Sequence, residues 1–141
     1  MRRLLLGSAF MLLSLDTQAG VLSCSFTEPF FTISFDSTTG VVTEISADET
    51  DPDTGKPIPK ILATSAKLEL VDPYADHQKL RLTNGGETLL DLSITMQADD
   101  GMSDSTYPME GKYGSNTGGC YTDKFPPFNP YEMLEGLGVQ P

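Results

Sequence analysis

The residues of this chain that could do chemistry are carboxylates, hydroxyls, two cysteines and one histidine. The histidine, His77, lies in the turn-like segment Tyr74-Ala75-Asp76-His77-Gln78. Nucleophilic catalysis needs a serine, threonine or cysteine beside an activating base, and no G-x-S-x-G or similar signature accompanies this histidine. The 20 acidic residues offer many carboxylate pairs for glycosidic chemistry, but nothing in the sequence selects one pair. We therefore predict a protein that is not an enzyme and that carries no cofactor.

Calcium binding is the second kind of chemistry to consider, in the acidic segment from Asp48 to Gly55. Asp51 and Asp53 belong to a D-x-D-x-G fragment, and clustered carboxylates on a loop turned by glycine suit Ca²⁺. A complete calcium loop adds a third ligand and a downstream bidentate glutamate, whereas Lys56-Pro57-Ile58-Pro59-Lys60 follows here. We predict an exposed loop without a metal, and calcium at Asp51 and Asp53 is the weaker alternative.

The N-terminal residues predict export from the cytoplasm. Two arginines after Met1 precede an apolar run from Leu4 to Leu15, and Asp16-Thr17-Gln18-Ala19-Gly20 follows. This order is typical of a cleaved secretory signal peptide, here residues 1–19. The apolar run of twelve residues is shorter than the roughly 20 that cross a bilayer, so no transmembrane segment is expected in the mature chain. We predict a periplasmic or secreted protein.

Two cysteines, Cys24 and Cys120, remain after removal of the signal peptide. An even number of cysteines in an exported protein is most simply a disulfide, so we predict a Cys24–Cys120 bond. The alternative is a lipid anchor at Cys24, because Val21-Leu22-Ser23-Cys24 loosely resembles a lipobox. The residues between Leu15 and Val21 favour the disulfide, since a lipoprotein signal would run straight on to its cysteine.

The charge of the chain restricts its partners. Nine basic and 20 acidic residues give a net charge of −11, and loss of Arg2, Arg3 and Asp16 with the signal peptide makes it −12. Such a surface repels phosphates, which argues against nucleic acid. The same charge favours a cationic partner such as a basic protein or peptide.

Strand-like alternation dominates the mature chain. In Phe31-Thr32-Ile33-Ser34-Phe35 large apolar side chains alternate with hydroxyls, and Ser37 to Gly40 then supplies turn residues before a second strand over 41–46. Three later segments, at 68–70, 80–82 and 90–96, repeat this period of two between further turn residues. We predict an all-β domain over residues 20–123, a small antiparallel β-barrel or barrel-like meander. A Pro-rich irregular tail follows at 124–141, with a short helix from Pro130 to Leu137. The expected core consists of Phe26, Phe31, Ile33, Phe35, Val42, Ile45, Leu68, Leu70, Leu80, Leu82, Leu90, Leu92 and Ile94.

Two segments carry a resemblance to known proteins. One is Thr27-Glu28-Pro29-Phe30-Phe31, early in the mature chain. The other is Asp100-Gly101-Met102-Ser103-Asp104-Ser105-Thr106-Tyr107-Pro108, which is followed by Gly119-Cys120. They resemble a poorly characterised family of bacterial envelope proteins and lipoproteins with a T-E-P-F-W strand, a D-G-M-S-D-x-x-Y-P segment and a closing G-C-C. The resemblance implies a small β-barrel-like domain of the periplasm or outer envelope, sometimes found beside lysozyme-inhibitor domains, and it implies no established activity.

The two segments could meet at one end of the barrel, where two interpretations remain open. One is a small binding surface made of Glu28, Phe31, Asp100, Met102, Asp104 and Tyr107. The other is a structural barrel corner closed by the turn at Asp100. For function, we predict a non-enzymatic binding protein of the bacterial envelope whose ligand the sequence does not identify. The alternative is an inhibitor of a basic cell-wall hydrolase such as lysozyme.

Overall fold

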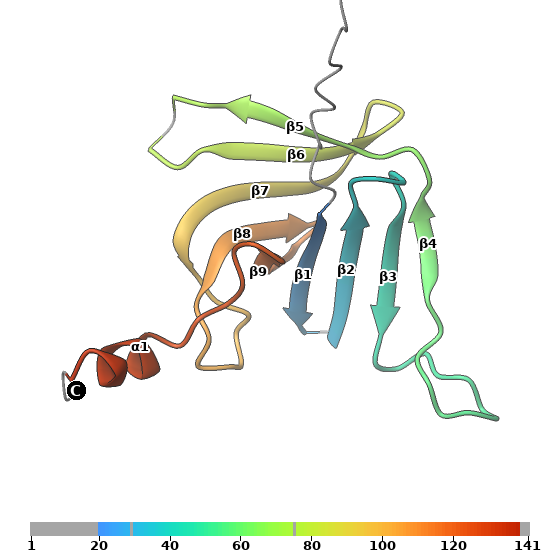
Figure 1. Ribbon diagram of the computed structural model, residues 1–141. Helices are drawn as coiled ribbons and strands as arrows, with labels where there is room; N and C mark the ends of the chain where they lie inside the picture. Colours follow the sequence, from blue (N-terminus) through green and yellow to red (C-terminus); the bar gives the residue numbers. More distant parts are fainter. Residues whose placement is uncertain (1–19, 29, 75, 139–141) are drawn as a thin grey trace, which may run out of the picture.

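The computed structural model describes residues 20–28, 30–74 and 76–138 of the chain. The predicted signal segment, residues 1–19, lies outside the described residues. Within them, the chain forms nine strands and one short helix (Figure 1). The elements are β1 (Val21–Thr27), β2 (Phe30–Asp36), β3 (Val42–Ser46), β4 (Lys60–Ala63), β5 (Lys67–Asp72), β6 (Lys79–Asn84), β7 (Glu87–Ala98), β8 (Tyr107–Tyr113), β9 (Asn116–Thr122) and α1 (Pro130–Gly136).

All nine strands belong to one antiparallel sheet in the order β4-β3-β2-β1-β9-β8-β7-β6-β5. Neighbouring strands are consecutive in the chain, except that β1 pairs with β9. In Figure 1, β1 to β4 stand side by side while β5 and β6 cross above their ends, so the sheet curls into a half-barrel. The prediction of an all-β, barrel-like antiparallel meander is confirmed.

The number of strands explains why the half-barrel stays open. Neighbours in this sheet alternate in direction, so the first and the ninth strand of the order, β4 and β5, run in the same direction. Parallel neighbours need a connection of roughly a dozen residues or more, whereas residues 64–66 alone link β4 to β5. β4 and β5 therefore remain the two edge strands of the sheet.

One face of the sheet, called the core face here, carries the buried side chains, and the opposite face is called the polar face. In β2, Phe31, Ile33 and Phe35 are buried, and the residues between them are half-buried. This alternation matches the predicted pattern and is repeated in β1. The buried apolar cluster consists of Leu22, Cys24, Phe26, Phe31, Ile33, Phe35, Val42, Ala63, Ala66, Leu82, Leu90, Leu92, Met109 and Cys120.

The disulfide joins the two ends of the domain within this core. Cys24 of β1 and Cys120 of β9 are directly opposed in the sheet, and their sulfurs are bonded. Gly111 of β8 leaves space for the bond, because a Cβ at that position would collide with the Sγ of Cys120. The predicted disulfide is confirmed. The sulfur of Cys24 is consequently not free for the alternative, a lipid anchor.

Three residues predicted for the core are exposed instead: Ile45 at 37%, Leu68 at 42% and Leu70 at 56%. Ile45 lies opposite Thr32 and so occupies the polar face. Leu68 lies on the core face, opposite the buried Leu82, but β5 is the last strand of the sheet and nothing beyond it covers this side chain. The openness of the half-barrel is therefore the reason why Leu68 and Leu70 are exposed, whereas the register of β3 is the reason for Ile45.

The C-terminal segment contains the predicted short helix, observed as α1, and is tied to the sheet by a bridge between Thr106 and Phe128. No helix among the described residues is both long and apolar enough to span a membrane.

Candidate functional site

Asp100 is the only charged side chain that is buried among the described residues, with 8% of its surface exposed. Its Oδ1 accepts hydrogen bonds from the backbone N–H groups of Met102 (3.0 Å) and Ser103 (2.8 Å). Its Oδ2 accepts from the Ser103 hydroxyl (2.8 Å) and from the Tyr107 hydroxyl (3.0 Å). Four donors thus surround one carboxylate, which fixes the shape of the loop between β7 and β8.

These contacts decide the protonation of the pair. Burial alone would raise the pKa of Asp100, but the hydrogen bonds from Ser103, Met102 and Tyr107 outweigh it and lower the pKa from 3.8 to about 2. Burial, the hydrogen bond to Asp100 and the negative charge of that carboxylate raise the pKa of Tyr107. At neutral pH the pair is a carboxylate that accepts a hydrogen bond from a neutral phenol. This arrangement is suited to rigidity, because neither group is poised to exchange a proton near pH 7.

The loop is positioned by an irregularity at the end of β7. The register between β7 and β8 moves from Ile94 opposite Met109 to Ala98 opposite Tyr107, so β7 contains two extra residues. Met96 lies in this bulge with φ of 57°, and it is the only non-glycine among the described residues with positive φ. The bulge redirects the chain, which is a common role of such features beside binding sites.

Beyond the bulge, the loop packs against the strands at the two ends of the domain. A Cβ on Gly101 would lie 2.9 Å from the Thr27 hydroxyl of β1, so only glycine permits this approach. The Tyr107 ring lies over Gly119 of β9, where a Cβ would come within 2.5 Å of it, and its centroid is 6.0 Å from that of Tyr121. The segments around Thr27 and Asp100 therefore meet, as the sequence predicts.

A groove with a volume of 370 Å³ runs along this junction on the polar face. It is called the Phe30 groove here and is defined by Phe30, Thr32, Ile45, Pro57 and Met102, which all line it. Phe30 is 50% exposed, and Met102 is 69% exposed. Apolar side chains from β2, from β3 and from the braced loop thus converge on one hollow.

Carboxylates dominate the surroundings of the Phe30 groove. Residues 20–55 contain seven acidic residues and neither lysine nor arginine. Glu28 and Asp48 directly follow the lining residues Thr27 and Ala47, and Asp99 precedes the lining residue Asp100. Lys56 beside Pro57 is the basic residue nearest in sequence to the lining residues. The groove therefore combines exposed apolar lining residues with chain segments that are rich in acidic residues.

The residues of the predicted binding surface fall into three environments. Asp100 and Met102 line the Phe30 groove, and Glu28 lines an adjoining hollow together with Gly101. Phe31 is 9% exposed and stacks on Phe26 at 4.6 Å between ring centroids, so it belongs mainly to the core. Asp104 is exposed on the loop, and Tyr107 is buried beneath it.

Of the five residues that define the groove, sequence reasoning found only Met102, and the two exposed apolar strand residues that it missed are Phe30 and Ile45. The signal for both was the period of two: because Phe31 faces the core, Phe30 must face the opposite side. Ile45 faces away from the core for the same reason, since Val42 faces the core and Ile45 lies an odd number of positions from it.

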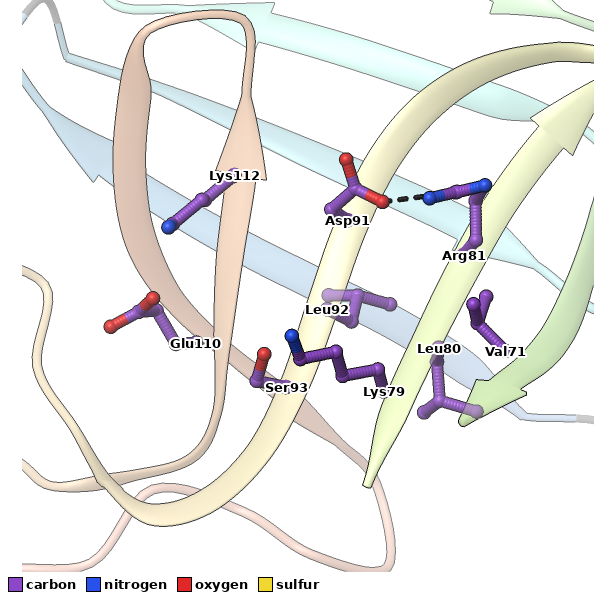
Figure 2. Close-up of a pocket in the computed structure, with 9 residues that line it drawn as sticks. All are labelled: Val71, Lys79, Leu80, Arg81, Asp91, Leu92, Ser93, Glu110 and Lys112. Carbon is purple, nitrogen blue, oxygen red and sulfur yellow. Dashed lines mark hydrogen bonds and ion pairs between the residues drawn. The ribbon is translucent and has the colours of Figure 1, made fainter. Parts of the chain in front are cut away.

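A second hollow of 280 Å³ lies on the polar face of β6, β7 and β8, shown in Figure 2. Glu69, Arg81, Asp91 and Lys112 are opposed in turn across four strands, so the charges alternate. Arg81 Nε lies 3.0 Å from Asp91 Oδ1, and both side chains are about half exposed (42% and 56%). Each charge in this row is compensated by its neighbour on the next strand. The row therefore stabilises the pairing of the strands, and an exposed ion pair of this kind contributes about 1 kcal/mol or less.

The acidic loop between β3 and β4 has the geometry of a turn. Asp51 Oδ1 accepts from the backbone N–H groups of Asp53 (2.8 Å) and Thr54 (3.2 Å), and Gly55 has a φ of 67°. Asp51 is therefore engaged with its own backbone. In the described part of the chain, no three His, Cys, Asp or Glu side chains gather closely enough to hold a metal ion.

Comparisons with known proteins add no relative to this picture. No protein-family model matches the chain, and no curated protein and no solved structure matches it either. The resemblance to bacterial envelope proteins therefore stays a prediction.

Proposed function

We propose that this protein is a non-enzymatic, periplasmic or secreted binding protein of the bacterial envelope, and that its ligand is a basic polypeptide held in the Phe30 groove. The single observation that carries the proposal is the exposure of Phe30, Ile45 and Met102 around one groove, next to a stretch of the chain, residues 20–55, that contains no lysine or arginine. An apolar centre with a polar rim is the usual anatomy of a protein interface.

The rigidity of the groove supports binding rather than catalysis. Met102 projects from a loop whose shape is fixed by the four hydrogen bonds of Asp100. A surface that is already ordered loses little conformational entropy when a partner docks. The disulfide supports the proposed compartment, because such bonds persist in oxidising environments outside the cytoplasm.

The proposal can be tested with a synthetic peptide of alternating lysine and leucine, by calorimetric titration at low and high salt. We expect Phe30→Ala combined with Met102→Ala to weaken binding about tenfold or more, as removal of central apolar anchors does. Ile61→Ala is the matched control, because Ile61 is 64% exposed on β4 and does not line the groove. Binding that high salt abolishes and that both variants retain would show diffuse charge attraction and contradict the groove.

An inhibitor of a basic cell-wall hydrolase such as lysozyme is the second candidate. The observation that favours it is again Met102, an apolar side chain presented on a braced loop beside the exposed Asp104. Such a loop can enter the substrate cleft of an enzyme, where the carboxylate would meet basic residues.

For this candidate, we expect the wild-type protein to slow the lysis of cell walls by a basic lysozyme. Met102→Lys should release the inhibition, whereas Ile61→Lys, at a similarly exposed apolar residue of β4 (64%), should not. Full lysozyme activity at saturating wild-type protein would exclude the inhibitor and leave the peptide-binding proposal standing.

A further inference from the structure

The edge strand β5 exposes three apolar side chains among three charged ones. All six of its residues are exposed, and Leu68 (42%), Leu70 (56%) and Val71 (45%) are apolar. One side of β5 pairs with β6, and no strand of the described chain pairs with the other side. Edge strands of natural proteins are usually shielded by proline, bulges or inward charges, because a bare edge is a template for pairing.

We propose that this edge pairs with the same edge of a second copy of the chain, antiparallel, about a two-fold axis at Leu68. The inference goes beyond the proposed function, and neither depends on the other. A two-fold interface is self-complementary: the axial residue faces itself, and each residue before it faces the corresponding residue after it in the other copy.

The charges of β5 select this axis among the four positions of its regular segment, residues 67–70, which pair without interruption with β6. An axis at Lys67 opposes lysine to lysine, and an axis at Glu69 opposes glutamate to glutamate, both of which are destabilising. An axis at Leu70 places Val71 opposite Glu69, at the point where the register of β5 is already broken. An axis at Leu68 instead places Lys67 opposite Glu69 of the other copy, twice in each dimer.

The same axis also covers part of the apolar surface that the open half-barrel leaves exposed. Leu68 would face Leu68 of the other copy, on the side continuous with the core face. Ala66, just before β5, is already buried, and its backbone N–H donates to the carbonyl of Gly40, so the new pairing is confined to residues 67–69. The pairing stays clear of Val71 and of Pro73, which lacks a backbone donor. Because the paired segment is short, we expect a weak dimer with a Kd in roughly the micromolar to millimolar range.

The dimer leaves the Phe30 groove free. The groove lies at the end of β1 and the beginning of β2, and these strand ends are at the opposite end of the half-barrel from β5 in Figure 1. A ligand in the groove and a second copy on β5 can therefore be bound together.

Charge exchange between two variants gives a sharp test. Lys67→Glu alone opposes Glu to Glu across the axis, and Glu69→Lys alone opposes Lys to Lys, so each variant should be monomeric. In an equimolar mixture of the two, every cross-axis pair is again a lysine facing a glutamate, so the mixture should form a heterodimer. The measurement is sedimentation equilibrium from about 10 µM to about 1 mM at physiological salt, where the Debye length of about 8 Å limits the repulsion between the acidic protomers.

Two controls separate this outcome from general effects of charge and folding. Glu87→Lys changes the net charge as Glu69→Lys does, but at the turn between β6 and β7, and should dimerise as the wild type does. Glu69 also faces Arg81 within its own chain, so circular dichroism melting must show that each variant is folded. A wild-type protein that is monomeric at 1 mM, a single variant that dimerises normally, or a mixture that stays monomeric would each overturn the proposal.

Discussion

Among single residues, Asp100 is a buried charge whose role is structural. A carboxylate without partners would cost several kcal/mol in such a position, and it would become protonated rather than stay charged. Here the donors of Met102, Ser103 and Tyr107 replace the lost water. The charge therefore holds together the loop that presents Met102, and the same hydrogen bonds make the stability of this loop depend on pH.

The pH dependence follows from the direction of the shift. The pKa of Asp100 is lowered to about 2 in the folded protein, so its contribution is complete above the ordinary value near 4 and is lost as the pH falls from about 4 to about 2. We expect Asp100→Asn to lower the free energy of unfolding at pH 7 by about 2 kcal/mol, with the difference from wild type shrinking over that pH window. Urea unfolding at a series of pH values measures this.

Asp104→Asn is the control for that experiment, because Asp104 is an exposed carboxylate of the same loop. It should shift the free energy of unfolding by about 0.5 kcal/mol or less. Tyr107→Phe removes one of the four donors and should reduce the pH-dependent contribution in part. An Asp100→Asn variant as stable as the wild type at pH 7 would contradict the role of the carboxylate.

At the scale of one element, β2 separates the two faces of the sheet most clearly. Ile33 is 1% exposed on the core face, while Thr32 is half-buried on the polar face. We expect Ile33→Asp to abolish folding, since an unpaired buried charge costs several kcal/mol. Thr32→Asp should cost about 1 kcal/mol, the range of strand propensity. Equal loss of the circular dichroism signal in both variants would mean that both faces of β2 are buried.

The strands differ in how far they could be predicted. β2 and β7 follow the period of two, and their positions are evident from the sequence. β8 and β9 were not predicted, because Gly111, Gly118 and Gly119 interrupt the alternation. Gly111 gives space to the disulfide, and Gly119 gives space to the Tyr107 ring. These glycines are therefore required by contacts between segments that are distant in the sequence. Such contacts are not visible in the local pattern.

The candidate site, like the strands, could be predicted only in part. The meeting of the segments around Thr27 and Asp100 could be anticipated from the sequence, whereas the groove between them could not. Its shape depends on the two extra residues of β7 and on the pairing of Ile45 with Thr32. A register is a property of two strands together, and neither strand specifies it alone.

For the whole molecule, the pairing of β1 with β9 is the step that turns a row of hairpins into one domain. Every other neighbouring pair in the sheet is consecutive in the chain, so it forms by local pairing. The β1–β9 pair alone joins the first strand to the last, and it carries the disulfide between residues separated by 96 positions. A large part of the domain's stability is therefore expected to depend on this single bond.

Reduction tests that dependence. In the chain-entropy model, closing a loop of this length stabilises the folded state by on the order of 4 to 5 kcal/mol, less any strain. We expect reduction, or replacement of both Cys24 and Cys120 by alanine, to lower the melting temperature by on the order of 15 °C. The intact mass of the purified protein should be two hydrogens below the reduced value, and thiol labelling should require prior reduction. A lipid adduct on Cys24, or a melting temperature unchanged by reduction, would show that the two ends of the domain are held together by β-pairing alone.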